Sequence, residues 1–362
     1  MPGVLRNSRS AYHRPIMPEH DPAETTVLVT GASGFIGLHC VRELLENGYR
    51  VRGTVRSLAR EPELRDALSK HVDTSRLELV EADLTHDEGW AEAVRGCRYV
   101  LHVASPVPTE PPKHEDELIV PAREGALRLL RAASDAGVER VVMTSSIAAV
   151  AEGHPHDPTK VFTEDDWSRV DADIGPYEKS KTLAERAAWD FVECLEGEKS
   201  LELTTINPGL VLGPVLEKDY GVSAQAILKL MRREYPGCPR LGWTIVDVRD
   251  VASAHLAAMT TPEAAGQRFC CCVDFVWMKD MAVILNEHFG DRGYKIPTRT
   301  LPDFVVPIAG LFDKVTRLVV PRLGHSETIS NARLKRVLGW QPRGTEEMVV
   351  ATGESLIEQG LV

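Results

Sequence analysis

The segment Thr30–Gly37 constrains the fold of this chain most strongly, because it places glycines at positions 31, 34 and 37 directly after a short apolar run. That run, residues 26–29, is rich in β-branched side chains and predicts a strand, whereas residues 35–45 carry apolar side chains at helical spacing. A tight strand-to-helix turn needs residues without a Cβ, and the free N–H groups at a helix start stabilise a phosphate charge. The segment therefore predicts a dinucleotide-binding turn, with the pyrophosphate held by Gly31, Ser33, Gly34, Phe35, Ile36 and Gly37.

Strand and helix patterns alternate after this turn. Further strands are predicted at residues 50–55, 77–80, 99–103, 140–144 and 203–206, with helical patterns between them, such as 118–136 and 176–192. Alternating strands and helices imply a parallel sheet that is covered on both faces and joined by right-handed crossovers. The predicted fold class is α/β: a Rossmann doubly wound parallel sheet with a smaller C-terminal substrate-binding lobe.

The chain divides into three expected parts. Residues 1–24 lack hydrophobic periodicity and the apolar core of a secretory signal, so we expect a disordered tail, within which Met17 is an alternative start. Residues 25–212 are expected to form the Rossmann domain. Residues 213–362, which are richer in proline, are expected to form mainly the substrate-binding lobe, with residues 243–260 returning to the main sheet as a strand and a helix.

Composition narrows the possible partners. The formal net charge of −11 argues against a nucleic-acid partner, which would need a concentrated basic face. No apolar run reaches the roughly 20 residues that cross a bilayer, so no membrane span is expected. The seven cysteines form no C-x-x-C pair, which predicts neither a metal site nor a disulfide framework, and indicates a reducing, cytoplasmic location. Cys270, Cys271 and Cys272 are expected to alternate between the faces of a buried strand.

The end of the second predicted strand indicates which dinucleotide binds. An NAD site usually has a carboxylate there for the ribose hydroxyls, but this chain has Arg52 to Arg56 with no acidic residue between them. The guanidinium of Arg56 could hold a 2′-phosphate, so NADP(H) is favoured over NAD(H). The alternative is that both arginines are merely solvated. Asp83, after the third strand, could lie beside an adenine or could simply cap the next turn.

A second group of residues suits proton transfer. Tyr177 and Lys181 are four apart at a helix start and therefore share one face. A neighbouring ammonium should lower the pKa of the phenol from about 10, and the same lysine can hold the nicotinamide ribose. Ser145 and Ser146 end the fifth strand, where a hydroxyl can bind a substrate oxygen. Each feature alone is usually structural, but their order after the glycine turn indicates a redox site.

Together these motifs resemble the extended short-chain dehydrogenases/reductases. The similarity is to dihydroflavonol reductases and to the aldehyde (carbonyl) reductases within the NAD-dependent epimerase/dehydratase superfamily, and it covers nearly the whole chain. The matching segments are residues 30–37, 51–56, 82–84, 101–106, 144–146, 177–181, 207–209 and 246–251.

The resemblance assigns roles residue by residue. It implies that Ser146, rather than Ser145, is catalytic with Tyr177 and Lys181, that Ser146 and Tyr177 meet the substrate, and that Arg56 meets the 2′-phosphate. It also implies a further set of cofactor contacts, from the adenine through the ribose to the nicotinamide, in which Tyr177 and Lys181 join Asp83, Leu84, Val103, Ala104, Ser105, Pro208, Gly209 and Leu210. By the same comparison, residues 247–251 serve to dock and cap a helix.

Several positions depart from the family pattern. Ala151 stands where flavonoid reductases carry an asparagine that contacts the flavonoid, which argues against a flavonoid substrate. The segment around Tyr177 lacks the Trp and Cys of the cinnamoyl-CoA reductase relatives, which argues against that substrate as well. Glu63 replaces a basic residue that helps to hold the phosphate in some reductases.

The sequence thus predicts an NADP(H)-dependent reductase of ketones or aldehydes to alcohols, or the reverse oxidation, with a small-molecule carbonyl or alcohol substrate. Alternatives are a 3-hydroxysteroid dehydrogenase, a nucleotide-sugar epimerase or dehydratase, and a non-enzymatic NADP-binding redox sensor. The sequence leaves both a monomer and a homodimer open. His102 is expected to be a structural core histidine. Candidates for the substrate pocket are Val107, Pro108, Tyr220 and Trp277.

Overall fold

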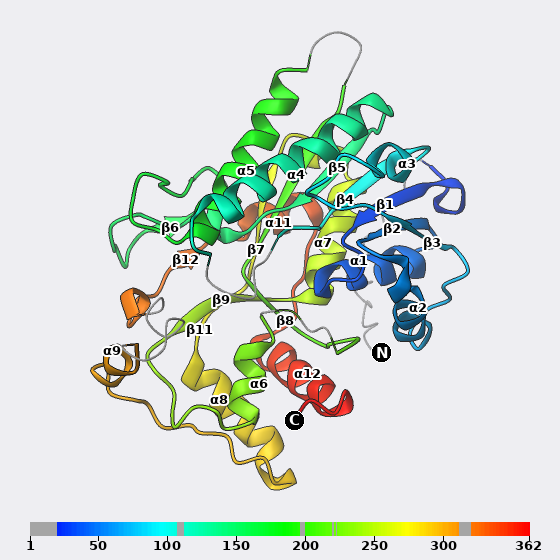
Figure 1. The fold of residues 1–362 in the computed structure, drawn as a ribbon. Helices are drawn as coiled ribbons and strands as arrows, with labels where there is room; N and C mark the ends of the chain where they lie inside the picture. Colours follow the sequence, from blue (N-terminus) through cyan, green and yellow to red (C-terminus); the bar gives the residue numbers. More distant parts are fainter. Residues whose placement is uncertain (1–19, 107–111, 196–199, 219–220, 222, 311–319) are drawn as a thin grey trace, which may run out of the picture.

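The computed structural model describes residues 20–106, 112–195, 200–218, 221, 223–310 and 320–362. A parallel sheet of seven strands forms its centre, in the order β10-β7-β5-β4-β1-β2-β3 (Figure 1). The strands are β1 (Thr26–Thr30), β2 (Arg50–Val55), β3 (Leu77–Glu81), β4 (Tyr99–His102), β5 (Arg140–Thr144), β7 (Glu202–Pro208) and β10 (Arg268–Cys271). All six strands expected in the Rossmann domain are present, and the predicted doubly wound fold is confirmed.

Two helical layers cover the sheet. The first layer contains α1 and α7, which pack against each other, and the second contains α3, α4 and α5 (Figure 1). These helices are α1 (Phe35–Glu46), α7 (Val248–Thr260), α3 (Trp90–Val94), α4 (Asp116–Asp135) and α5 (Pro176–Glu193). The last one carries Tyr177 and Lys181 and runs beside α4.

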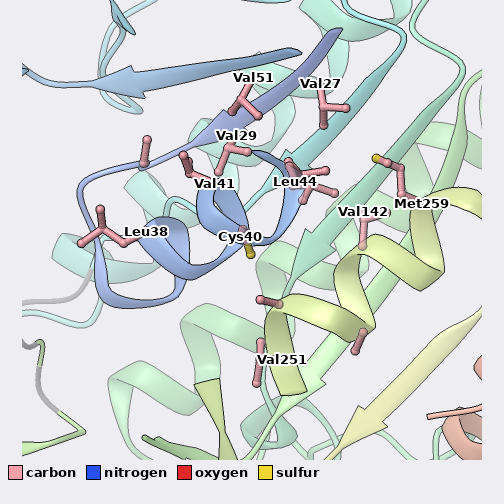
Figure 2. Close-up of a cluster of buried hydrophobic side chains, with 14 of the residues drawn as sticks. Val27, Val29, Leu38, Cys40, Val41, Leu44, Val51, Val142, Val251 and Met259 are labelled. Carbon is pink, nitrogen blue, oxygen red and sulfur yellow. The ribbon is translucent and has the colours of Figure 1, made fainter. Parts of the chain in front are cut away.

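The alternation of side chains along β1 explains why both faces are covered. Val27 and Val29 pack with Leu38, Leu44 and Val251 of α1 and α7 (Figure 2). Leu28, between the two valines, points to the opposite face and belongs to the cluster formed with α3, α4 and α5. All three side chains are fully buried, as expected for a strand in the middle of a parallel sheet.

The C-terminal part adds a smaller lobe with its own apolar core (Figure 1). A three-stranded sheet, in the order β11-β9-β8, packs there with three helices. Its elements are β8 (Leu210–Leu212), β9 (Gly242–Asp247), β11 (Phe275–Trp277), α6 (Gln225–Met231), α8 (Met278–Phe289) and α12 (Thr345–Glu358). The other α-helices and strands in the described part of the chain are α2 (Glu61–Ser69), α9 (Val305–Gly310), α11 (Ala332–Leu338) and the paired short strands β6 (Val161–Phe162) and β12 (Thr328–Ile329).

The structure corrects the expected division of the chain in one respect. The prediction that both a strand and a helix of residues 243–260 return to the main sheet is wrong for the strand. The helix α7 does pack on the main sheet, but β9 pairs with β8 and β11 in the small sheet. The seventh strand of the main sheet is instead β10, from the region expected to form the substrate lobe. A continuous apolar strand does not reveal which of two neighbouring sheets it will join.

The cysteines of this seventh strand follow the expected pattern. Cys271 belongs to the core beneath α1 and α7, whereas Cys270 and Cys272 belong to a cluster on the other side with Val150 and Phe162. All three thiols are buried, so the predicted alternation of faces is confirmed. In the described part of the chain, no three His, Cys, Asp or Glu side chains are grouped so as to hold a metal ion.

The chain before β1 is partly described. Residues 1–19, with Met17, lie outside the described residues. Where the sequence predicted an unstructured tail to residue 24, the structure has a 3-10 helix, Pro22–Glu24, capped by Asp21. None of the helices described in the structure combines the length and the apolar composition that a membrane crossing requires.

Candidate active site

The glycine turn between β1 and α1 is fixed by the neighbouring strand β2. Gly31 has a φ of +66°, a conformation that L side chains rarely adopt. Thr54 of β2 holds the turn, since its Oγ1 accepts a hydrogen bond from the Gly31 N–H at 3.0 Å and its carbonyl oxygen accepts one from the Ala32 N–H at 3.0 Å. The glycine pattern did not point to Thr54, because its contribution depends on the strand register.

The second and third glycines of the turn meet different surroundings. A Cβ on Gly37 would lie 2.1 Å from the Gly31 carbonyl oxygen, so packing alone requires glycine at position 37. A Cβ on Gly34 would meet only that same oxygen, at an ordinary 3.4 Å. Packing therefore does not explain glycine at position 34, whereas close approach of a bound pyrophosphate to the backbone would.

The start of α1 is suited to an anion. Gly34 is its N-cap, and no side chain in the described part of the chain caps the first turn. Its free N–H groups and the positive end of the helix dipole point to the position where a phosphate would lie.

Arg52 within β2 and Arg56 directly after it have different surroundings. Arg52 Nε donates to Glu78 at 2.8 Å and its NH1 group donates to the Arg95 carbonyl oxygen at 2.7 Å. Arg52 therefore links β2 to β3 and to the residue after α3. Arg56, at the end of the strand, is exposed and makes no hydrogen bond or ion pair with any described residue. Hydrogen bonds within its own turn lower the pKa of Asp83 at the same sheet edge, the positive charge of Arg56 adds to this shift, and the exposed guanidinium could meet a phosphate.

The other expected cofactor contacts follow neighbouring strands at the same edge of the sheet. Because the strands are parallel, the residues after β3, β2, β1, β4, β5 and β7 form a continuous row. Asp83 accepts hydrogen bonds from the backbone N–H (2.7 Å) and hydroxyl (2.6 Å) of Thr85, so it caps the turn while remaining at this edge. The row consists of Asp83 and Leu84 after β3, Arg56 after β2, Gly31 after β1, Val103, Ala104 and Ser105 after β4, Ser146 after β5, and Pro208, Gly209 and Leu210 at the end of β7.

Direct contacts bring parts of this row together. A Cβ on Gly31 would lie 3.0 Å from Ala104 Cα, so the turns after β1 and β4 touch. The Ala104 N–H donates to Thr30 Oγ1, which also lies 2.9 Å from His102 Nδ1. Burial lowers the pKa of His102 to about 3, so this histidine is neutral and serves the core.

Ser146 and Tyr177 approach each other from two elements. Ser146 follows β5, and its hydroxyl oxygen accepts a hydrogen bond from the Ala148 N–H at 3.1 Å. Tyr177 is the second residue of α5, which begins at Pro176 after the extended Gly175. Proline at the first helical position and tyrosine at the second place the phenol at the helix start that faces Ser146.

The pKa of Tyr177 is raised, not lowered as expected from the nearby ammonium. Desolvation of the hydroxyl is the largest cause, and a hydrogen bond with Ser146 partly offsets it. The residue is 36% exposed, yet desolvation dominates because its hydroxyl end faces Ser146 in the interior. The phenol is therefore protonated at neutral pH, which suits donation of a proton.

Lys181 lies one turn further along α5. Its Nζ is 5.9 Å from the centroid of the Tyr177 ring. Burial lowers the pKa of Lys181 to about 8, and the carboxylate of Glu185 acts in the opposite direction. A buried ammonium that still carries its charge near neutral pH can hold a ribose hydroxyl and stabilise negative charge on the phenol.

Charged side chains that the sequence did not indicate gather around Glu178, the residue after Tyr177. Arg322, from a 3-10 helix at Val320–Arg322, contacts Glu178 at 3.4 Å and also pairs with Glu152. Burial raises the pKa of Glu152 to about 7, although Arg322 lowers it. These residues are far apart in sequence, so only the fold brings them together.

The substrate-pocket candidates are only partly described. Val107, Pro108 and Tyr220 lie outside the described residues. Trp277 ends β11 in the small sheet and packs edge-on against Phe275, with the ring centroids 4.9 Å apart. A separate surface hollow of about 580 Å³ lies between α3 and α4, lined by Trp90 and Arg128 among others, and contains no residue of the candidate site.

Comparisons with known proteins show the family to which the chain belongs. The model of the NAD dependent epimerase/dehydratase family matches residues 27–272. Cinnamoyl-CoA reductase 1 of Petunia hybrida is 38% identical, with 92% of each chain covered. Dihydroflavonol 4-reductase of Zea mays is 35% identical over 76% of each chain.

A solved structure extends the similarity to three dimensions. Yeast methylglyoxal/isovaleraldehyde reductase Gre2, complexed with NADPH, superimposes with a TM-score of 0.78 at 29% identity, covering 93% of this chain and all of that one. Fold, glycine turn and family match together place the protein: the chain belongs to the NAD-dependent epimerase/dehydratase family, among the extended short-chain dehydrogenases/reductases related to dihydroflavonol reductase and Gre2.

Proposed function

We propose that this protein is an NADP(H)-dependent reductase of ketones and aldehydes. The observation that carries the proposal is the approach of a protonated Tyr177 to Ser146, with the ammonium of Lys181 beside the phenol ring, at the sheet edge that also bears the glycine turn. A proton donor, a hydroxyl that can bind an oxygen, and a dinucleotide site are the parts that a carbonyl reduction needs.

The residues at this edge fit NADP(H). Packing within the protein does not require glycine at position 34, but the missing side chain leaves room for a pyrophosphate. The uncapped start of α1 offers N–H donors to it. Arg56 is an exposed cation that could hold a 2′-phosphate, and no carboxylate lies between Arg52 and Arg56 in the sequence to compete for the ribose. Asp83, Leu84, Val103, Ala104 and Ser105 would line the adenosine half, while Lys181, Pro208, Gly209 and Leu210 would line the nicotinamide half.

The chain's own residues then divide the remaining work. When bound, NADPH supplies the hydride. Ser146 donates a hydrogen bond to the substrate carbonyl oxygen and holds it within reach of Tyr177. Tyr177 gives its phenolic proton to that oxygen, and the positive charge of Lys181 stabilises the phenolate that remains. In this proposal Ser146, Tyr177 and Lys181 handle the oxygen, and the neutral His102 takes no part.

The names of the relatives suggest which carbonyl compounds to try first. Gre2 is described as a methylglyoxal and isovaleraldehyde reductase, and the petunia relative as a cinnamoyl-CoA reductase. Position 151 is Ala and the segment before Tyr177 reads Ile174-Gly175-Pro176, which departs from flavonoid and cinnamoyl-CoA reductases respectively. We therefore propose a small aldehyde or ketone as substrate.

The proposal is tested by following oxidation of NADPH and of NADH with the purified protein. Methylglyoxal, isovaleraldehyde, an aryl ketone, cinnamoyl-CoA, a dihydroflavonol and a 3-ketosteroid cover the alternatives. Turnover with NADPH on the small carbonyls, and little on the large ones, is the expected result. Tight NADPH binding without turnover on any compound would reject the reductase and favour a sugar substrate or a redox sensor.

A further inference from the structure

Glu185 is the most heavily hydrogen-bonded side chain of the catalytic helix α5, and its side chain is fully buried. It lies one turn after Lys181 and two turns after Tyr177, on the same face of the helix. Five side chains donate to its carboxylate, at distances of 2.5–3.4 Å: Ser145, Trp189, Thr205, Asn207 and Arg268.

These donors tie α5 to three strands. Ser145 follows β5, Thr205 and Asn207 belong to β7, and Arg268 begins β10. A single carboxylate on the helix therefore fixes both the rotation of α5 about its axis and its position along the sheet. Small errors in either would move the Tyr177 hydroxyl away from Ser146.

Asn207 extends this control to Ser146. Its Nδ2 group donates to Glu185 Oε2 at 2.8 Å and to the Ser146 carbonyl oxygen at 3.1 Å. Glu185 thus orients the amide that holds the backbone of Ser146, and it binds the hydroxyl of the preceding Ser145 at 2.5 Å. The positions of Tyr177 on α5 and of Ser146 after β5 therefore both depend on the carboxylate of Glu185.

Arg268 balances the buried charge. Its Nε lies 2.6 Å from Glu185 Oε1, and its NH1 group donates to the carbonyl oxygens of Glu164 and Asp166 at 2.7 and 2.8 Å. Its guanidinium stacks on the Trp167 ring at 3.7 Å from the centroid. A buried ion pair of this kind is usually neutral or costly for stability compared with apolar residues, so its presence calls for a role in specifying geometry.

We propose, on the basis of the reductase function above, that Glu185 is the positioning residue of the catalytic site: it sets α5 relative to Ser146 and supplies the negative charge that keeps the ammonium of Lys181 charged. Glu185 acts through Ser146, Tyr177 and Lys181 and does not itself reach the substrate. The charge and the reach of the side chain make two separable contributions.

The charged groups around Lys181 indicate that its ammonium depends on Glu185 in particular. Glu185 is the one charged side chain in the described part of the chain that raises the pKa of Lys181. On α5 the other neighbour is Tyr177, whose hydroxyl is neutral at physiological pH. His102 on β4 faces the lysine as well and is neutral. Among the described residues, no second carboxylate acts on Lys181 that could replace Glu185.

Competitive acetylation with acetic anhydride, read by mass spectrometry of the peptide that contains Lys181, measures the pH at which this lysine loses its proton, and it needs no turnover. In Glu185→Gln we expect that midpoint to fall by about one pH unit. In Glu185→Asp, which keeps the charge but shortens the reach, the midpoint should stay close to that of the wild type while kcat falls at least tenfold. Glu164→Gln is the matched control, because Glu164 is a buried carboxylate that accepts a hydrogen bond from the Cys270 N–H and makes no hydrogen bond or ion pair with the described residues of α5; it should change neither quantity.

The outcomes are separable from failure of the proposed function. If the wild type reduces no carbonyl compound, the reductase is rejected while the acetylation midpoint still tests Glu185. Should Glu185→Gln not fold because Arg268 is left without its partner, the double variant Glu185→Gln/Arg268→Gln leaves no unbalanced charge, and its midpoint must still fall, although by less because a cation is removed as well. An unchanged midpoint in a folded Gln variant, or failure of both variants to fold, would assign Glu185 to stability alone and overturn the proposal.

Discussion

Gly37 on α1 lies so close to Gly31 that a Cβ at position 37 would be 2.1 Å from the Gly31 carbonyl oxygen. The helix and the turn before it are therefore locked together through backbone contact. Gly31 itself touches Ala104 of the next turn along the sheet edge. The glycine turn is thus packed against both the helix α1 and the turn after β4.

We expect Gly37→Ala to cost about 1–3 kcal/mol of folding free energy, because the backbone must shift to admit the methyl group. Urea unfolding followed by circular dichroism measures this loss. Gly290→Ala is the matched control, since Gly290 has ordinary helical backbone angles and a Cβ there would meet nothing closer than 3.5 Å. Equal stability of the two variants would show that the close approach of Gly37 to the Gly31 carbonyl oxygen does not contribute to the folding free energy.

Arg56→Asp should shift cofactor preference from NADPH towards NADH. A charge-assisted hydrogen bond contributes about 1.5–3 kcal/mol, and every 1.4 kcal/mol is a factor of ten. The kcat/KM with NADPH divided by the kcat/KM with NADH should therefore fall at least tenfold. Arg52→Ala is the control: Arg52 is bound to Glu78 and to backbone carbonyls, so its loss should lower stability and leave the preference unchanged. An unaltered ratio in Arg56→Asp would remove Arg56 from the phosphate site.

The pH dependence of kcat/KM for NADPH should report Lys181 in the free enzyme. The charged form is the useful one, and burial lowers its pKa to about 8. Activity should therefore be full below this pH and fall about tenfold for each pH unit well above it. A profile that stays flat to pH 10 would show that the charge of Lys181 does not contribute.

Much of the fold could be predicted from local patterns. The glycine spacing, the alternating strands and the helix start at Pro176 are encoded within short windows, and they place the candidate residues at one sheet edge. The assignment of β9 to the small sheet and of β10 to the main sheet could not be predicted, because strand pairing over a long separation leaves no local mark.

The electrostatics of the site were also beyond local patterns. The sequence predicts that Lys181 lowers the pKa of Tyr177, since it shows the spacing but not the burial that dominates. Arg322 and Glu152 are 170 residues apart, and Glu185 meets donors from three strands. Such contacts depend on tertiary structure, and only the spacing of Glu185 from Lys181 could have hinted at one of them.

Comparison of Tyr177→Phe with the wild type tests the central claim most directly. The variant removes one hydroxyl and retains the ring, so NADPH affinity measured by titration should stay within about twofold while turnover of a small carbonyl compound falls at least a thousandfold, near the upper range for loss of a general acid. Turnover close to that of the wild type, with the cofactor bound equally well, would contradict the assignment of Tyr177 as the proton donor.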